Sequence, residues 1–465
     1  MFATATRASA VKFNIMLQRA IRTICSFAIL TIILASASAQ TVRFHTNVGD
    51  INVLLLPSNT PLTVANFLNY MNKGAYTNSI VHRSVTGFIW QGGGYKYDSD
   101  AVSAIDQNPA VKNEPGISNL RGTIAMAKLG SSANSATNQW FFNLADNSAN
   151  LDKQNGGFTA FGRVTDSASL AVMDKIAGFP ICSVNSIFTE IPLFNCQGAI
   201  TENFVIILSI GIVPAISSNG VLSASGFGGA PVAAAGSYIE IYGANLAGDV
   251  SRGWATADFN NGAAPTSLEG VTVKVNGIPA FVNYVSKTQV NVQVPAGVPS
   301  SGSVPIVVSY GGQDSLAANL TLKSTAPGLL APASFKADGL QYIVAVHAVT
   351  GGFVNKGNIP NLPTAPAAPG ETLTLYGTGF GPVASGAAIA GMVAPGTAVI
   401  STPFDIRIGG QTATVSYAGL APNLVGVYQF NVVVPSSLTT GDHAVEATLG
   451  GEPLAQKLFL YIRAN

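Results

Sequence analysis

Charged residues are scarce in this sequence. Only 10% of its 465 residues are Asp, Glu, Lys or Arg, and the formal net charge is +1. A chain with so few basic groups has no cationic surface that could neutralise a phosphate backbone, so we expect no nucleic-acid partner. The four histidines are widely scattered, which argues against a metal centre. The sequence therefore predicts neither a metal nor another cofactor.

Long hydrophobic runs are missing as well. The run at residues 24–34 is far shorter than the ~20 residues that a membrane-spanning helix needs. Basic residues without any acid precede it, and the small residues 35–39 follow it. This order is typical of a secretory signal peptide, here residues 1–39, with Met16 as an alternative start. We therefore expect a secreted or periplasmic protein without a stable membrane span after cleavage; a membrane anchor is the less favoured interpretation.

Cysteine is rare, with three residues in the whole chain. Cys25 is removed with the predicted signal peptide, which leaves Cys182 and Cys196. An even number of cysteines in an exported protein indicates a disulfide, and closing a loop of about 15 residues contributes roughly 3 kcal/mol in the chain-entropy model. Two buried free thiols are the alternative.

Glycine, proline and apolar residues are abundant, and together they indicate a β protein rich in turns. The chain has 49 Gly and 25 Pro, and 48% of its residues are hydrophobic. Its length suits two to four domains. Apolar runs around residues 47–50 predict a hairpin, and a further strand is predicted at 204–210. One helix is predicted to start at Pro61 with Thr60 as its cap, and a second, capped by Asp166 or Ser167, is predicted to end at Gly178.

The second half of the chain contains an internal repeat. The segment GSYIEIYGANLAG at 236–248 matches GETLTLYGTGFGP at 370–382, and the segment ending at Pro295 matches one ending at Pro435. Short alternating strands with Gly and Pro turns favour β-sandwiches. We therefore expect a first domain at 40–212, a Ser/Gly/Ala-rich linker at 213–230, and repeats at 231–330 and 331–465. The repeats resemble IPT/TIG-like immunoglobulin modules of secreted acidobacterial proteins, and their ligand is unknown.

The stretch HRSVTGFIWQGG at residues 82–93 carries the main functional signal. It places Arg83, Phe88 and Gln91 among apolar neighbours and ends in two glycines that allow close backbone approach. It closely resembles the signature of the cyclophilin-type peptidyl-prolyl isomerases. The resemblance extends upstream to residue 63 and downstream through RGTIAMAKLG, NQWFFNLADN and GGFTAFGRV, which lie between residues 121 and 164. It implies a mainly β fold, an eight-stranded β-barrel with two capping helices.

The resemblance also implies the residues of the active site. Rotation about a prolyl peptide bond is opposed by amide resonance, a barrier of about 18–20 kcal/mol. A guanidinium that donates to the prolyl nitrogen as the amide twists would stabilise only the twisted state. By resemblance, Arg83 supplies this donor, and Phe88 and Gln91 complete the catalytic set. The remaining substrate-binding positions are Ile89, Met126, Ala127, Gln139, Phe141, Leu151 and Phe158.

Four positions depart from the family pattern. Asn150 stands where many members carry an aromatic residue, and Phe158 stands where the better-known eukaryotic members have His. Lys128 replaces the usual Asn and Trp140 a Phe. The first two changes reshape the rim of the pocket, so substrate preference and inhibitor binding are open, but none of the four removes the guanidinium.

The sequence thus predicts a peptidyl-prolyl cis-trans isomerase that assists the folding of extracytoplasmic proteins and takes proline-containing polypeptides as partners. The alternative is a non-catalytic surface or adhesion protein that only binds proline-containing segments. An intact Arg83 favours the enzyme.

Overall fold

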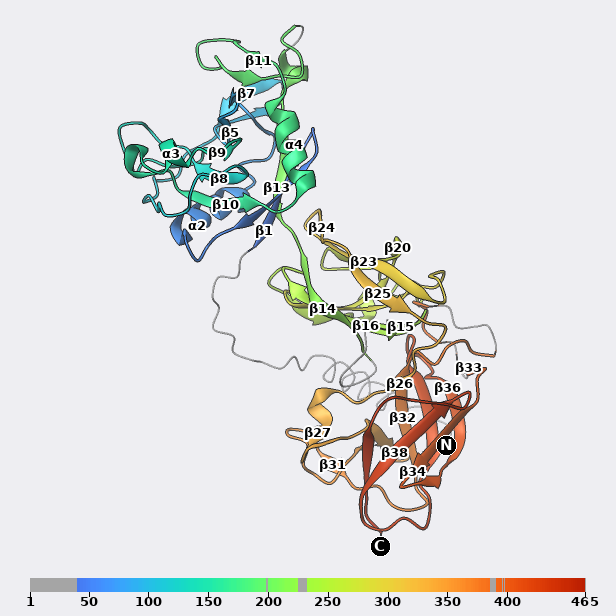
Figure 1. The fold of residues 1–465 in the computed structure, drawn as a ribbon. Helices are drawn as coiled ribbons and strands as arrows, with labels where there is room; N and C mark the ends of the chain where they lie inside the picture. Colours follow the sequence, from blue (N-terminus) through green and yellow to red (C-terminus); the bar gives the residue numbers. More distant parts are fainter. Residues whose placement is uncertain are drawn as a thin grey trace. The chain divides into compact units, whose positions relative to one another are not determined.

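The computed structural model describes residues 40–197, 200–224, 232–384, 390–394, 396 and 398–464 (Figure 1). The predicted signal peptide lies outside these residues. Within them, none of the helices is both long and apolar enough to cross a membrane. The described residues divide into two compact units, one containing residues 40–213 together with 311–313, the other containing residues 214–310 and those from 314 onward.

The first unit is built on one curled sheet of eleven strands. Their order in the sheet is β4-β5-β9-β8-β10-β2-β1-β13-β3-β6-β7. The expected mainly β fold is present, and the short strands β3, β6 and β7 extend the sheet beyond β13. The strands are β1 (Thr41–Thr46), β2 (Asp50–Leu55), β3 (Ser79–Ile80), β4 (Arg83–Val85), β5 (Ile89–Gly92), β6 (Tyr95–Asp98), β7 (Ala101–Ala104), β8 (Thr123–Met126), β9 (Trp140–Asn143), β10 (Ala160–Val164) and β13 (Ile206–Ile212).

The buried core of this unit, the aromatic core, contains eight aromatic side chains among its 23 described residues. The predicted hairpin β1–β2 and the closing strand β13 are confirmed, since β1 pairs with both neighbours in antiparallel register. Alternate residues of these strands, such as Phe44 and Val53, are fully buried. Phe44 packs edge-on against Trp140 with ring centroids 5.0 Å apart. The departure at Trp140 therefore fills the core, and it leaves the substrate surface unchanged.

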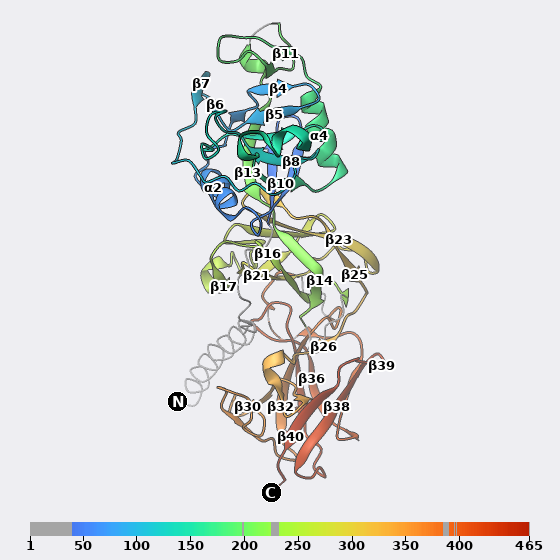
Figure 2. The same cartoon turned by 60° about the vertical axis from the view of Figure 1, so that its left-hand side comes forward.

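Two longer helices, α2 (Pro61–Asn72) and α4 (Ser167–Ala177), lie on opposite sides of the sheet in both views (Figures 1 and 2). The short elements are α3 (Ser148–Leu151), η1 (Gln154–Gly156) and η2 (Ile200–Asn203). The predicted cap of α4 is confirmed, because the Asp166 carboxylate accepts from the Ser169 N–H at 2.7 Å.

The start of α2 differs from the prediction. The Thr60 side chain makes no capping hydrogen bond and donates to the Leu56 carbonyl instead. The Glu114 carboxylate, distant in sequence, accepts from the Leu62 and Thr63 N–H groups. A carboxylate at the N-terminus of a helix accepts hydrogen bonds from the free N–H groups and interacts favourably with the helix dipole. Glu114 therefore caps α2 in place of Thr60.

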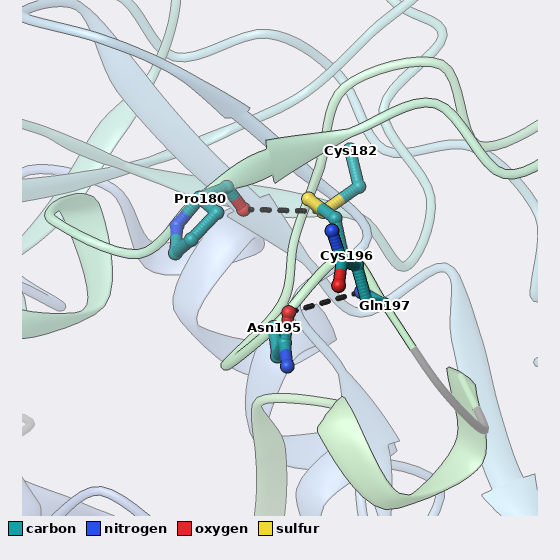
Figure 3. The surroundings of a disulfide bond; sticks show 5 residues. All are labelled: Pro180, Cys182, Asn195, Cys196 and Gln197. Atoms are coloured by element: carbon teal, nitrogen blue, oxygen red, sulfur yellow. Dashed lines mark hydrogen bonds between the residues drawn. A yellow bond between two sulfur atoms is a disulfide. The ribbon is translucent and has the colours of Figure 1, made fainter.

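A disulfide closes the segment between α4 and β13. Cys182 is bonded to Cys196, as predicted (Figure 3). The segment contains a small antiparallel pair, β11 (Ile181–Cys182) and β12 (Ile191–Pro192). Cys182 itself belongs to a separate apolar cluster that includes Ile80 and Phe204. The disulfide therefore fixes a short, packed segment against the edge of the sheet.

The second unit consists of two β-sandwiches with matching strand orders. In the first, β14-β16-β22-β21-β17 faces a sheet containing β25-β23-β19; in the second, β29-β32-β37-β36-β33 faces β40-β38-β34. The predicted repeat is thus visible in the topology. The first sandwich has β14 (Ala215–Ser223), β15 (Val232–Ala233), β16 (Tyr238–Ala244), β17 (Ser251–Gly253), β18 (Ser267–Leu268), β19 (Val271–Val275), β20 (Ile278–Pro279), β21 (Phe281–Ser286), β22 (Gln289–Gln293), β23 (Gly302–Tyr310), β24 (Gln313–Asp314), β25 (Ala318–Leu322) and η3 (Thr256–Asp258).

The second sandwich is built in the same way, with extra short strands on the β29 side of its first sheet. Its elements are β26 (Gly328–Leu329), η4 (Ala333–Phe335), β27 (Lys336–Ala337), β28 (Leu340–Gln341), β29 (Ala345–His347), β30 (Phe353–Val354), β31 (Thr364–Ala365), β32 (Thr372–Thr378), β33 (Ala398–Val399), β34 (Phe404–Ile408), β35 (Gln411–Thr412), β36 (Thr414–Leu420), β37 (Tyr428–Val433), β38 (Gly441–Leu449), β39 (Glu452–Pro453) and β40 (Leu458–Ile462).

Two domain boundaries need correction. Residues 215–223, predicted as part of a linker, form β14, which pairs with β16 in the first sandwich. Backbone hydrogen bonds hold this strand in the sheet, and these do not depend on its Ser-rich side chains. The second repeat begins before residue 331, because β26 pairs with β32.

Candidate active site

The predicted site residues Arg83, Gln91 and Phe141 lie in one row across three neighbouring strands. Arg83 on β4 is the cross-strand partner of Gln91 on β5, and Gln91 is the partner of Phe141 on β9. The row continues through Ala125 to Ala160. Directly opposed residues of antiparallel strands project to the same face. The sheet therefore brings the guanidinium, the amide and the aromatic ring together.

An apolar side-chain cluster, the candidate proline pocket, lies beside this row, on the face opposite the aromatic core. Ile89, Phe141 and Leu151 are buried in one cluster, and Phe88 and Phe158 pack against it partly exposed. The Phe141 and Phe158 rings meet edge-on, with centroids 5.8 Å apart. Each of these five side chains was predicted to bind substrate or to assist catalysis. Together they form an apolar surface that suits a proline ring.

Met126 does not belong to this pocket. It is 2% exposed and packs in the aromatic core on the other face of the sheet. Side chains alternate along β8, so Ala125 and Ala127 face the pocket and the residue between them points away. The prediction that Met126 contacts the substrate is therefore wrong.

The predicted amides hold one another in place. Gln91 Nε2 donates to Gln139 Oε1 at 2.7 Å, so the two glutamines act as a pair beside Arg83. The Ala127 N–H already donates to the Gln139 carbonyl at 3.0 Å. A bound peptide would therefore not receive a hydrogen bond from that amide.

The two glycines that end the signature are required by packing. A Cβ on Gly92 would lie 2.7 Å from the Trp140 ring, and one on Gly93 would lie 2.6 Å from the Asn138 carbonyl. Gly93 also has a φ of +79°, which L side chains rarely adopt. The glycine pair thus lets β5 lie close to β9, which sets the position of Gln91.

An asparagine network, which sequence reasoning missed, supports the pocket wall. Asn147 Nδ2 donates to the Phe88 carbonyl at 2.9 Å. Asn119 donates to the Asp152 carboxylate through both its backbone and its side chain. Burial raises the pKa of Asp152, but the hydrogen bonds from Asn119 outweigh it and the pKa is lowered. These bonds fix the short segment that carries Leu151.

Lys128 has a structural role at the pocket rim. Its Nζ donates to the carbonyls of Asn155 and Gly157 and lies 4.7 Å from the centre of the Phe158 ring. Burial lowers the pKa of this ammonium. The substitution from the family's usual Asn therefore anchors the loop that presents Phe158.

His82, which precedes Arg83, is buried. Burial lowers its pKa to about 4, with a smaller contribution from the charge of Arg83. At neutral pH the imidazole is therefore uncharged. It packs edge-on against Tyr95, with ring centroids 5.2 Å apart.

Glu190 is a further residue at the site that the sequence did not indicate. Its Oε2 accepts a hydrogen bond from Arg83 Nε at 2.8 Å, and its carbonyl accepts from the Ser84 N–H at 2.7 Å. Glu190 lies in the disulfide-closed segment, 107 residues from Arg83. No local sequence pattern connects residues so far apart.

Comparisons with known proteins match the first domain to one family and the first repeat to another. A family model described as cyclophilin type peptidyl-prolyl cis-trans isomerase/CLD matches residues 41–197, and the IPT/TIG domain model matches 230–324. Peptidyl-prolyl cis-trans isomerase A of Dickeya dadantii is 39% identical over 162 residues, 34% of this chain and 82% of the relative. Peptidyl-prolyl cis-trans isomerase B of Escherichia coli is 39% identical over 143 residues, 30% of this chain and 84% of the relative. A solved cyclophilin-type isomerase of Cryptosporidium parvum has a TM-score of 0.28 and 25% identity, and the match covers 37% of this chain and 97% of that structure.

Proposed function

Because the chain belongs to the cyclophilin-type peptidyl-prolyl cis-trans isomerase family and is such an isomerase, we propose that it acts on exported proteins and that Arg83 stabilises the twisted prolyl amide. The observation that carries the catalytic assignment is the row Arg83–Gln91–Phe141 beside the apolar pocket. It places one permanently charged, planar donor at the edge of a surface that fits a proline ring.

The reaction requires little from the protein besides this arrangement. The proline ring packs on Phe141 and its apolar neighbours, and the glutamine pair aligns the peptide. As the amide twists, the prolyl nitrogen regains its lone pair and becomes an acceptor. The Arg83 guanidinium donates to it, which stabilises the twisted state and leaves the planar ground state nearly unaffected. No covalent bond is broken, so neither a nucleophile nor a general base is needed.

Two features support an extracytoplasmic location. The predicted signal peptide at residues 1–39 has a basic start, a short apolar run and small residues before its predicted cleavage site. The Cys182–Cys196 disulfide belongs to the class of bond that persists in oxidising compartments. Proline-containing segments of proteins folding in such a compartment are therefore the proposed substrates.

The isomerase unit should work without the sandwiches. A protein of residues 40–213 contains all strands of the curled sheet and every site residue named above. We expect its kcat/KM on a proline peptide in a protease-coupled assay to stay within about twofold of that of residues 40–465. The cut lies after residue 213 because β14 belongs to the first sandwich. A folded but inactive 40–213 would show that the repeats contribute to the site.

Asn150 should weaken binding of cyclosporin-type inhibitors. This side chain is exposed on α3, next to Leu151 of the pocket, where many family members carry an aromatic residue. We expect Asn150→Trp to strengthen inhibition, because it restores an apolar wall at the rim. Titration of inhibitor against both proteins measures the effect, with Asn150→Ala as the control. Tight inhibition of the unmodified protein would contradict the expectation.

A further inference from the structure

The disulfide-closed segment, residues 182–196, contacts the catalytic strand at two consecutive residues. Glu190 accepts the Arg83 Nε–H through its side chain at 2.8 Å and the Ser84 N–H through its carbonyl at 2.7 Å. The backbone bond sets the position of the segment relative to β4. The side-chain bond then joins its only carboxylate to the guanidinium.

The choice of donor matters for the chemistry. Nε–H lies on the stem side of the guanidinium, and the other four of its five donors are on the two terminal nitrogens. A bond to Nε therefore restricts rotation of the guanidinium plane without using the terminal donors. Holding a reacting group in its productive orientation is a recognised source of rate.

The segment is packed well enough to hold Glu190 in place. Phe188 and Ile191, on either side of Glu190, are buried in the apolar cluster with Ile80. The Phe188 ring meets Tyr95 edge-on, with centroids 4.9 Å apart. The Asn185 side chain accepts from the N–H groups of Ile187 and Phe188, which tightens the turn before Glu190.

The disulfide closes this segment at its two ends. Cys182 lies on β11, which pairs with β12 directly after Glu190, and Cys196 follows β12 (Figure 3). A covalent link at this point keeps β12 beside β11, and β12 in turn lies against β4, where the Ser84 N–H donates to the Glu190 carbonyl. The position of the Glu190 carboxylate thus depends on the disulfide.

We propose that Glu190 is a positioning residue for the Arg83 guanidinium and that the Cys182–Cys196 disulfide maintains this position. The inference rests on the proposed catalytic role of Arg83. Both side chains are more than 40% exposed, 43% for Arg83 and 44% for Glu190. Exposed ion pairs contribute little to stability. The Arg83–Glu190 pair therefore acts by orienting the guanidinium, and its effect is expected in kcat.

The first test replaces Glu190 in the full mature chain. Glu190→Gln keeps the shape and a weaker acceptor, and we expect kcat to fall about two- to fivefold with KM unchanged. Glu190→Lys places a like charge beside Arg83, and we expect a loss of about tenfold or more. Glu202→Lys, at an exposed position of η2 before β13, is the matched control and should have wild-type kcat. Wild-type kcat in Glu190→Lys would overturn the proposal.

The second test asks whether the disulfide acts through Glu190. The double variant Cys182→Ser/Cys196→Ser should lower kcat in the wild-type background and cause little further loss in the Glu190→Ala background, because residues of one network are not additive. An equal loss in both backgrounds would overturn the role assigned to the disulfide. Circular dichroism checks that each variant is folded.

The third test observes the guanidinium itself. In ¹⁵N NMR spectra the Arg83 Nε–H should give a resolved, slowly exchanging signal that Arg83→Ala identifies. We expect Glu190→Gln to shift it and Glu190→Ala to broaden it, and Glu202→Lys to leave it unchanged. An Nε–H signal identical in all Glu190 variants would contradict the inference. If Arg83→Ala itself kept full activity, the proposed function would fail independently of Glu190.

Discussion

Replacing Arg83 by alanine is expected to lower kcat/KM by at least ten- to a hundredfold. A hydrogen bond from a charged group contributes about 1.5–3 kcal/mol, and each 1.36 kcal/mol is about tenfold in rate. We expect the loss to lie mainly in the rate, because Gln91 and Phe141, the residues proposed to hold the peptide beside Arg83, come from other strands and remain in place. A protease-coupled assay with a proline peptide measures the effect.

Arg83→Lys is the matched variant for this prediction. It keeps the positive charge but replaces the planar fork with a point-like ammonium, so we expect little recovery of activity. It also lacks the Nε–H that Glu190 accepts. Full activity in Arg83→Ala, with folding confirmed by circular dichroism, would show that the guanidinium is not required.

The second large effect concerns stability in acid. The pKa of His82 is lowered to about 4 in the folded protein, mainly by burial, from an ordinary value of 6.5. Between these two values the unfolded chain binds one proton more than the folded chain. Stability therefore falls as the pH is lowered from about 6.5 to about 4 and levels off below that, with a total loss on the order of 3 kcal/mol.

Urea unfolding of residues 40–213 at several pH values tests this expectation. Trp90 and Trp140 are fully buried in this unit and report its unfolding by fluorescence. His82→Asn removes the titrating group, so its stability should change much less across the same pH range. The carboxylates whose pKa values are lowered, such as Asp152 and Asp166, contribute mainly below this window. A wild-type curve as flat as that of His82→Asn would contradict the assignment.

The central residues of the site could be predicted from the sequence because they lie close together along the chain. Arg83 and Gln91 lie on the two strands of one hairpin, so the pairing of this hairpin alone sets their relative position. Gly87, with a φ of +69°, forms the turn between those strands, and it too belongs to the signature. The resemblance then supplied Phe141, Leu151 and Phe158, which the structure places in one cluster.

Other features depended on information that the sequence does not carry locally. Met126 is apolar and stands within a family motif, but its direction is set by alternation along β8, which sends it into the core. Glu190 reaches Arg83 only because the disulfide-closed segment packs on β4. Strand β14 forms through backbone pairing with β16, which its Ser-rich composition does not reveal.

The central claim is that Arg83 acts on the twisted amide and contributes little to binding of the planar peptide. It is tested most directly by NMR exchange spectroscopy on a proline peptide saturated with wild-type protein or Arg83→Ala, together with the Kd of the same peptide. The account predicts that the cis–trans exchange rate on the protein falls at least about tenfold in Arg83→Ala, while Kd changes much less, because the aromatic pocket and the glutamine pair hold the ground state. An unchanged exchange rate on the bound peptide, with the whole loss of activity in Kd, would instead make the guanidinium a peptide anchor and contradict the account.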